Sequence, residues 1–316
     1  MKKLTIAVLM GGPSTEREVS LRSGEAVVNA LRVTGADVVA TDITDTTFTV
    51  PKDVDVAFVA LHGTFGEDGT LQQILEDSGI AYTGSGPEAS ARAFDKIAAK
   101  EAFLSAGIRT PKYEIFDRAH TSSHRSTGLA FPLVVKPSRQ GSSVGVSIVE
   151  EEGDLEEACQ TAWQYDDRLL VEPFIVGREL TVGIFDGQAL PVVQIEPHQD
   201  FFTYEAKYTK GQSDYLVPAP LEKETELLVK STALRAHECL GCRDLSRVDL
   251  ILAESGELFV LEVNTIPGFT ETSLVPKAAW AAGIGFPDLC ARLVRMALAR
   301  RGPLGAAAKD TAVVST

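Results

Sequence analysis

Short runs of apolar residues divide the first third of the chain. Each run is three to eight residues long, rich in Val, Ile, Leu and Ala, and ends at glycine, proline or polar residues. Continuous apolar runs of this length are typical of strands that are buried on both faces, as in parallel sheets. The predicted strands span residues 4–10, 37–41, 54–61 and 80–82.

Amphipathic stretches separate these strands and predict helices. Thr15 and Glu18 have the spacing of a capping box, so we expect a helix to begin there and to run to Val33. A second, shorter helix is expected over residues 71–77. Strands that alternate with helices in this way predict a parallel, Rossmann-like sheet in an N-terminal domain of residues 1–94.

From Asp95 onward the pattern predicts α+β structure. Asp186-Gly187 between two apolar runs is a strong hairpin signal, which indicates antiparallel pairing. We expect two further units, residues 95–180 and residues 181–301. The predicted helices span 95–106, 154–165, 225–240 and 286–300, and the predicted strands span 133–136, 145–149, 169–172, 179–185, 246–254 and 258–263.

Two segments lack periodicity. Residues 198–220 are polar and aromatic, and a loop of that length inside a compact protein is usually a functional lid. Residues 302–316 are small and polar, and we expect a disordered tail there.

Composition excludes several classes of protein. The net charge is −14 and the pI is about 4.9, which argues against nucleic-acid binding because that requires a basic surface. No apolar stretch approaches the roughly 18 residues of a membrane span, and the N-terminal run is too short for a signal peptide. We therefore expect a cytoplasmic protein without membrane contact. Cys239 and Cys242 have the spacing of half a zinc site, but without a second pair we expect ordinary thiols near a helix end.

The segment from Lys136 to Gly145 is a candidate phosphate site. A lysine at the end of a predicted strand precedes a loop of glycine and serine, whose backbone amides can surround a phosphate group. The order differs from a Walker A loop, in which the lysine follows the glycines. Glycine- and serine-rich loops are also common as plain turns, so this segment alone leaves both interpretations open.

Alternating polar residues on two late strands suggest a metal site. Arg247 and Asp249 share one face of a predicted strand, and Glu262 and Asn264 share one face of the next. If the strands pair, three oxygen donors converge beside a cation, which suits magnesium and nucleotide phosphates. The alternative is a solvated polar face on an antiparallel sheet.

Further polar residues follow the early strands, where open α/β sheets bind ligands. Glu16 can hold a substrate ammonium group, or it can simply favour the start of a helix through the helix dipole. His62 is either a structural residue or part of the same site. Glu172 and Glu179 flank a turn and can bind ribose or adenine, or remain solvated.

Taken together, these segments resemble the D-alanine–D-alanine ligases of the ATP-grasp superfamily, in the family's order and over nearly the whole chain. The resemblance implies an ATP-grasp fold behind the Rossmann-like N-terminal domain. The five motifs that carry it are GGPSTEREVS at 11–20, HGTFGEDG at 62–69, KPSRQGSSVG at 136–145, YEAKY at 204–208 and EVNTIPG at 262–268.

The resemblance implies ATP and two Mg²⁺ (or Mn²⁺) ions as cofactors, D-alanine as substrate and a homodimer as the assembly. It assigns the metal ions to Asp249, Glu262 and Asn264. The residues implied at ATP are Lys96 and Lys136 at the phosphates, Ser142 and Ser143 in the loop, Glu172 and Ile175 at the adenine, Glu179 at the ribose, and Lys207 from the lid.

The implied reaction proceeds through an acyl phosphate, which a second D-alanine attacks with its amine. Tyr208 in the lid favours an amine over a hydroxyl as this nucleophile, because relatives that use D-lactate typically carry a histidine in that segment. The resemblance implies that Glu16 binds the ammonium group of the first D-alanine, with His62 nearby. It implies that Arg247 and the amide of Gly268 stabilise the oxyanion, and that Ser273 and Leu274 bind the second substrate. Glu16, Ser142 and Tyr208 are implied to form a hydrogen-bonded set.

Three alternatives remain at this point. An ATP-grasp ligase for another amino acid or hydroxy acid would differ in its product. A nucleotide-binding regulatory protein would bind ATP without releasing phosphate, and the intact set of Arg247, Asp249, Glu262 and Asn264 argues against it. A dinucleotide-binding Rossmann domain would need a third glycine after Gly11-Gly12, which the sequence lacks.

Overall fold

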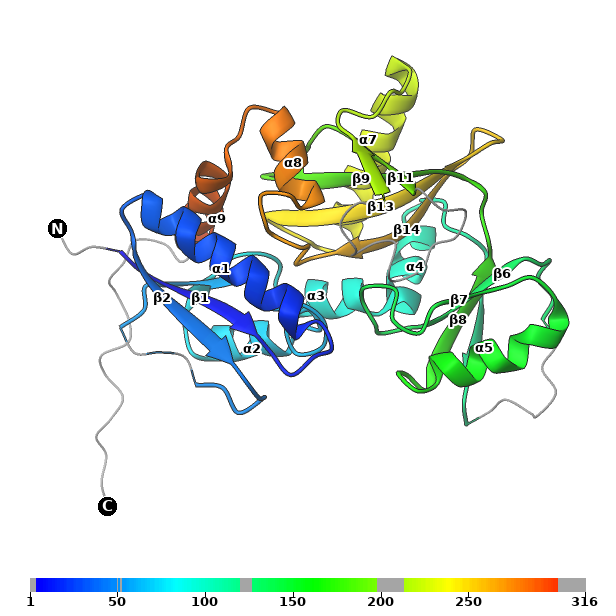
Figure 1. Ribbon diagram of the computed structural model, residues 1–316, viewed down its shortest axis with the longest axis horizontal. Helices are drawn as coiled ribbons and strands as arrows, with labels where there is room; N and C mark the ends of the chain where they lie inside the picture. Colours follow the sequence, from blue (N-terminus) through cyan, green and yellow to red (C-terminus); the bar gives the residue numbers. More distant parts are fainter. Residues whose placement is uncertain (1–3, 50, 52, 120–126, 198–212, 301–316) are drawn as a thin grey trace.

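The computed structural model describes residues 4–49, 51, 53–119, 127–197 and 213–300. These residues form three sheets, which lie in a row along the long axis of the molecule (Figure 1). A parallel sheet from the N-terminal part lies at one end and a small antiparallel sheet at the other. A six-stranded sheet from the C-terminal part lies between them. The mixed α/β and α+β class predicted from the sequence is confirmed.

The N-terminal sheet is parallel, with the strand order β2-β1-β3-β4. Apolar side chains on successive positions of β1 point to opposite faces, so both faces are buried. Helices α1 and α9 cover one face and α2 covers the other. The elements are β1 Thr5–Gly11, α1 Arg17–Val33, β2 Asp37–Ile43, β3 Val56–Val59, α2 Thr70–Asp77, β4 Ala81–Tyr82 and α9 Phe286–Arg300.

Helix α1 begins later than the sequence predicted. Its N-cap residue is Glu16, and no side chain makes a capping hydrogen bond there, so the capping box expected at Thr15 and Glu18 is wrong. The carboxylate of Glu16 faces the loops after β3 and β6 instead of the helix amides. The side chain of Glu16, at the N-cap position, therefore makes tertiary contacts and does not cap the helix.

The six-stranded sheet is antiparallel and follows the order β12-β11-β9-β13-β14, with β10 beside β9. Alternate residues of β9, from Leu180 to Ile184, pack against α7. The opposite face carries Glu179 of β9 and the polar residues of β13 and β14, with α8 at one end. The elements are β9 Gly177–Phe185, β10 Gln188–Ala189, β11 Val193–Pro197, β12 Ser213–Leu216, α7 Lys223–Cys239, β13 Leu245–Ala253, β14 Leu258–Asn264 and α8 Leu274–Ala281.

The small sheet has the order β5-β8-β6-β7 and is covered on one face by α5. Helices α3 and α4 connect the N-terminal sheet to it (Figure 1) and contact β14 on the way. Helix α4 begins where predicted because the carboxylate of Asp95 accepts hydrogen bonds from the amides of Ile97 and Ala98. The elements are α3 Pro87–Phe94, α4 Lys96–Ser105, β5 Glu114–Asp117, β6 Leu133–Pro137, β7 Ser147–Val149, the 3-10 helix η1 Glu152–Asp154, α5 Leu155–Ala162 and β8 Arg168–Pro173.

Several expectations from the sequence are corrected. The predicted loop over 198–220 contains strand β12, which pairs with β11, and the sequence pattern also missed β5, β11, α3 and α8. The rest of that loop, 198–212, and the tail 302–316 lie outside the described residues. The hairpin turn is confirmed, since Asp186 and Gly187 both have positive φ. The division into units at residues 94 and 180 stays a prediction, and α9 packs on the N-terminal sheet although it belongs to the last predicted unit.

The cysteines are ordinary thiols. All four are free, and Cys239 is the last residue of α7, as the prediction of thiols near a helix end requires. Burial raises the pKa of Cys242 to about 12. Within the described part of the chain, no helix is long and apolar enough to cross a membrane.

Candidate active site

A cavity of about 490 Å³ lies between the N-terminal sheet and the polar face of the six-stranded sheet. Loops after β1 and β3 line one side of it, and β9, β13, β14 and the start of α8 line the other. It therefore gathers residues that are far apart in the sequence. The lining includes Glu16, His62, Lys96, Ser142, Glu179, Arg247, Asp249, Glu262, Asn264, Gly268, Ser273 and Leu274.

Four further predicted residues lie elsewhere. Lys136, Ser143, Glu172 and Ile175 are described but do not line this cavity. Lys207 and Tyr208 lie outside the described residues, so the predicted contact of Tyr208 with Ser142 has no structural account here.

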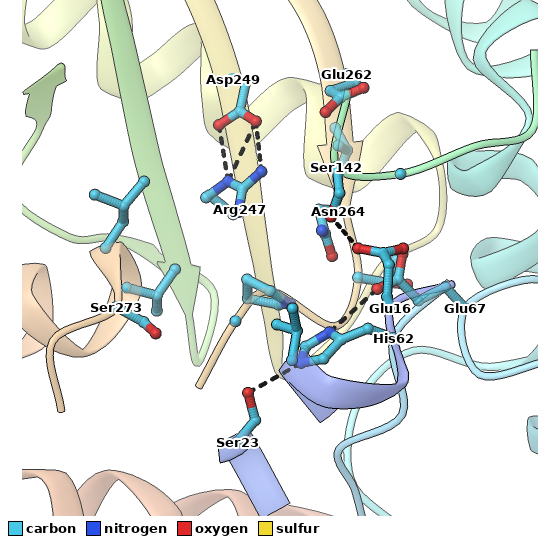
Figure 2. A pocket seen from close by; sticks show the side chains of 18 of the residues that line it. Glu16, Ser23, His62, Glu67, Ser142, Arg247, Asp249, Glu262, Asn264 and Ser273 are labelled. Atoms are coloured by element: carbon cyan, nitrogen blue, oxygen red, sulfur yellow. Dashed lines mark hydrogen bonds and ion pairs between the residues drawn. The ribbon is translucent and has the colours of Figure 1, made fainter. Parts of the chain in front are cut away.

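The two pairs of polar residues on β13 and β14 come together as their alternation predicted. The antiparallel register places Arg247 opposite Asn264 and Asp249 opposite Glu262. Arg247 binds Asp249 through Nη2 at 2.7 Å and Nε at 2.9 Å (Figure 2). The carboxylates of Asp249 and Glu262 each have a cationic side chain as partner, since Lys96 Nζ lies 3.1 Å from Glu262 Oε2.

The chemistry of this donor set fits a hard divalent cation. Asp249 and Glu262 supply carboxylate oxygens from neighbouring strands, and Asn264 supplies an amide oxygen that accepts a hydrogen bond from the Ile266 amide at 2.8 Å. Among the described residues, no three His, Cys, Asp or Glu side chains gather as a metal cluster. A cation bound here would thus need ligands beyond these protein carboxylates, and nucleotide phosphates are the natural source.

Glu16 is buried and closely surrounded. Ser142 donates a hydrogen bond to it from the loop after β6, as Figure 2 shows. A Cβ atom at Gly141 would lie 2.6 Å from Glu16 Oε2, and one at Gly63 would lie 2.8 Å from it. A side chain at either glycine would therefore displace the carboxylate of Glu16. The loop brings a serine hydroxyl to the carboxylate from a different sheet.

A second ionic group lies on the face of the small sheet away from α5. Glu172 of β8 forms ion pairs with Lys136 of β6 and with Lys100 of α4, whose Nζ is 2.7 Å from Glu172 Oε2. Lys100 is fully buried and also donates to Thr110 Oγ1 at 2.7 Å and to Pro111 O at 3.2 Å.

The pKa values of these groups follow from their burial and their partners. Burial opposes ionisation of Glu172, but Lys136 and Lys100 outweigh it and lower the pKa of this carboxyl. Burial lowers the pKa of Lys100 to about 8 despite Glu172. The group is thus a buried carboxylate held between two lysines.

Comparisons with known proteins agree with this geometry. The family model described as "D-ala D-ala ligase C-terminus" matches residues 103–295, and "D-ala D-ala ligase N-terminus" matches residues 46–85. A D-alanine–D-alanine ligase of Methylacidiphilum infernorum is 46% identical over 295 residues, covering 93% of this chain and 96% of the relative. One of Desulforudis audaxviator is 48% identical over 303 residues, covering 93% and 99%.

The chain belongs to the D-alanine–D-alanine ligase family.

A solved structure supports the ligase family at the level of the fold. The crystal structure of D-alanine–D-alanine ligase from Bacillus anthracis, complexed with ATP, superimposes with a TM-score of 0.85 at 33% identity. The alignment covers 96% of this chain and all of that one. The ATP-grasp fold predicted from the motifs is thereby confirmed.

Three residues of this ligase family member escaped the sequence reasoning. Lys100 looks like a surface residue of a helix, although its position four residues after Lys96 places it on the same helical face. Ser23 and Glu67 are buried beside His62. Burial raises the pKa of Glu67 to about 6, and the nearby charge of Glu16 adds to the effect. Glu67 lies in the motif at 62–69, which was its only signal.

Proposed function

We propose that the protein joins two molecules of D-alanine into D-alanyl-D-alanine, with conversion of ATP to ADP and phosphate, for peptidoglycan precursor synthesis. The observation that carries the proposal is the convergence, in one cavity, of Glu16 with Ser142 from one side and of Arg247, Asp249 and Glu262 from the other. A buried carboxylate suits a substrate ammonium group, and the opposite side suits charged phosphates and a developing oxyanion.

The first step activates a carboxylate. Glu16 binds the ammonium group of the first D-alanine, with His62 nearby, and so directs its carboxylate toward the cations of the cavity. A carboxylate oxygen attacks the γ-phosphorus of ATP, the bond to the bridging oxygen breaks, and ADP leaves. Lys96 and Lys136 bind the phosphates, whose charge they offset. The product is an acyl phosphate.

The second step forms the peptide bond. Ser273 and Leu274 position the second D-alanine, whose amine attacks the activated carbonyl. Arg247 and the amide of Gly268 stabilise the tetrahedral oxyanion, and phosphate then leaves with the original carboxylate oxygen. Glu16, Ser142 and Tyr208 form the hydrogen-bonded set around the reacting groups. The proposal keeps the lid for residues 198–212, which would exclude water that otherwise hydrolyses the acyl phosphate.

Asp249, Glu262 and Asn264 would hold two Mg²⁺ (or Mn²⁺) ions. Bound there, such ions supply positive charge against the triphosphate and against the charge that develops in phosphoryl transfer. Lys96 pairs with Glu262 and donates to the Gln140 carbonyl at 2.6 Å, and it would turn from Glu262 toward a phosphate.

The nucleotide lies between the small sheet and the six-stranded sheet in this proposal. Glu172 and Ile175 contact the adenine and Glu179 the ribose, while Ser142, Ser143 and Lys207 contact the phosphates. The position of Glu179, buried at the cavity wall on β9, supports its part in this assignment. The proposal also includes a homodimer in the cytoplasm, which sedimentation and cell fractionation would test.

Product analysis tests the proposed function. The protein is incubated with ATP, Mg²⁺ and either D-alanine, L-alanine, D-serine or D-lactate, and products are identified by mass. Phosphate release that requires D-alanine, with D-alanyl-D-alanine formed, is the expected result. Phosphate release only with one of the other compounds would identify that compound, and not D-alanine, as the substrate. ATP binding without phosphate release in any mixture would contradict a ligase.

A further inference from the structure

Ser23 and His62 form a buried bridge between the N-terminal sheet and the loop after β14. Ser23 lies on α1 and His62 follows β3, and their side chains meet at 3.0 Å between Oγ and Nε2 (Figure 2). The other ring nitrogen of His62, Nδ1, lies 2.8 Å from the carbonyl oxygen of Ile266. Ser23 Oγ lies 3.1 Å from the amide nitrogen of Phe269.

The partners at the two ends limit the directions of the hydrogen bonds in this bridge. A carbonyl oxygen only accepts, so His62 Nδ1 carries a hydrogen and donates to Ile266, and Glu67 Oε1 lies 3.4 Å from the same nitrogen. The Phe269 amide only donates, and Ser23 Oγ accepts from it. In the Nδ1–H tautomer, Nε2 is an acceptor for the hydroxyl of Ser23.

The bridge attaches the loop at two points that flank Gly268. Ile266 lies two residues before it and Phe269 directly after it, and the ring of Phe269 packs between Phe58 and Phe286 at centroid distances of 5.8 and 5.5 Å. The peptide unit that carries the Gly268 amide, between Pro267 and Gly268, therefore lies between two units that are anchored from the N-terminal side. Gly268 itself lines the cavity, with a Cβ position 3.5 Å from Ser273 Oγ.

We propose that Ser23 and His62 are positioning residues, which hold the backbone of residues 266–269 so that the Gly268 amide meets the oxyanion. This inference rests on the proposed function, in which that amide stabilises the tetrahedral intermediate. Both ring nitrogens of His62 already have protein partners within hydrogen-bond distance, and the side chain is 3% exposed. His62 thus acts through the loop. An error of about 1 Å in such a donor costs on the order of a hundredfold in rate.

Ser20 provides a matched control for Ser23. It lies one turn earlier on α1 and is fully buried. Its hydroxyl also accepts from a backbone amide, that of Gly11 at 2.9 Å, and donates to a carbonyl, that of Ala60 at 2.7 Å. Gly11 is the last residue of β1 and Ala60 directly follows β3. Replacing Ser20 by alanine therefore removes equivalent hydrogen bonds without touching the loop of residues 266–269.

The test compares Ser23→Ala, Ser20→Ala and the unmodified protein in three measurements. Steady-state kinetics give kcat and the KM values for ATP and D-alanine. Inhibition by a dipeptide phosphinate, whose tetrahedral phosphorus carries an oxygen in place of the oxyanion, reports on binding of the transition state. Hydrogen–deuterium exchange of the peptide that contains residues 265–270 reports on the loop without any substrate.

We expect Ser23→Ala to lower kcat about tenfold or more, to weaken phosphinate binding by a similar factor and to leave KM for ATP within about twofold. Exchange of the loop peptide should accelerate in Ser23→Ala only, while the melting temperatures of both variants fall by similar amounts. In a His62→Gln background, Ser23→Ala should add little further loss, because the two residues act as one unit.

Equal kcat, equal phosphinate binding and equal loop exchange in the two serine variants would overturn the inference alone. Faster loop exchange in Ser23→Ala with kcat unchanged would also overturn it, because the loop would then not position a reacting group. Absence of dipeptide from the unmodified protein would overturn the proposed function, and with it the catalytic reason for the bridge.

Discussion

Arg247 holds both oxygens of the Asp249 carboxylate, with Nη2 2.7 Å from Oδ2 and Nε 2.9 Å from Oδ1. The two residues lie on the same face of β13, and Glu262 lies opposite Asp249 on β14. A fork of this kind fixes the direction of the guanidinium as well as the charge of the carboxylate. Arg247, which is expected to bind the oxyanion, is thereby linked to Asp249, which is expected to bind a metal ion.

Replacing Arg247 by lysine keeps the positive charge and removes the fork. A lysine ammonium is a point charge and does not bind two carboxylate oxygens in the same plane. We expect kcat to fall by about 10²- to 10³-fold, the range for loss of one oxyanion donor, while ATP binding changes little. Turnover and nucleotide titration measure the two effects. A variant that keeps full turnover would place the oxyanion elsewhere.

Glu16→Gln tests the site of the first substrate. The amide keeps the size of the side chain and loses the charge that would bind an ammonium group. A charge-assisted hydrogen bond contributes about 1.5–3 kcal/mol, so KM for the first D-alanine should rise roughly 10- to 100-fold. Glu18→Gln, two residues away on α1, is the control. Equal KM values in the two variants would exclude Glu16 as the ammonium ligand.

Lys100→Met tests the buried ionic group. The substitution keeps an unbranched side chain but leaves Glu172 with one lysine and removes the donor to Thr110. Breaking a buried pair costs about 3–5 kcal/mol of unfolding free energy, and ATP binding should weaken because Glu172 orients Lys136. Chemical denaturation and nucleotide titration measure these effects.

The partly exposed pair of Lys230 and Glu226 on α7 supplies the control for Lys100. Because solvent screens such a pair, Lys230→Met should change the unfolding free energy by at most about 1 kcal/mol. A Lys100→Met protein as stable as this control, with unchanged ATP binding, would show that Lys100 is neutral or replaceable in its site.

The raised pKa of Glu67 predicts that the free energy of unfolding falls as the pH rises. Burial raises the pKa of this carboxyl from 4.5 to about 6 in the folded protein. The folded state therefore binds the proton more tightly than the unfolded state, and the stability present below pH 4.5 is lost as the pH rises through 6. The loss at pH 7 is about 2 kcal/mol, at about 1.4 kcal/mol for each pKa unit.

A Glu67→Gln variant lacks this titration. The unfolding free energy of the variant relative to the unmodified protein should increase by about 2 kcal/mol between pH 4.5 and pH 7, as measured by denaturation at several pH values. Glu25→Gln, at an exposed position of α1, is the control. A difference that stays constant with pH would show that Glu67 does not titrate in this range.

Much of the fold could be predicted where the apolar pattern is local. Helix α9 begins and ends at the predicted residues because Phe286, Leu289, Cys290, Leu293 and Val294 follow the helical period and are all buried. Helix α8 was missed because it is short, carries Pro276 and has Lys277 as its one charged residue, so its buried face has little contrast with its exposed face. Strand β12 was missed because its pairing with β11 crosses residues 198–212.

The candidate site, like the fold, could be predicted in part from the sequence. The pairing of Asp249 with Glu262 could be predicted, since strand alternation fixes which side chains share a face and only the register remained open. The burial of Lys100 and the bridge from Ser23 to Phe269 could not, because both depend on contacts between segments that no local pattern connects. The sequence distance in that bridge is 246 residues.

The transfer of oxygen from substrate to phosphate tests the central claim most directly. D-alanine labelled with ¹⁸O in its carboxylate is incubated with the protein, ATP and Mg²⁺, and the released phosphate is analysed by mass. If a carboxylate oxygen attacks the γ-phosphorus and leaves on the phosphate after the amine attacks the carbonyl carbon, each phosphate carries one ¹⁸O, ADP accumulates and D-alanyl-D-alanine forms in equal amount. Unlabelled phosphate, or label in AMP, would contradict an acyl-phosphate ligase.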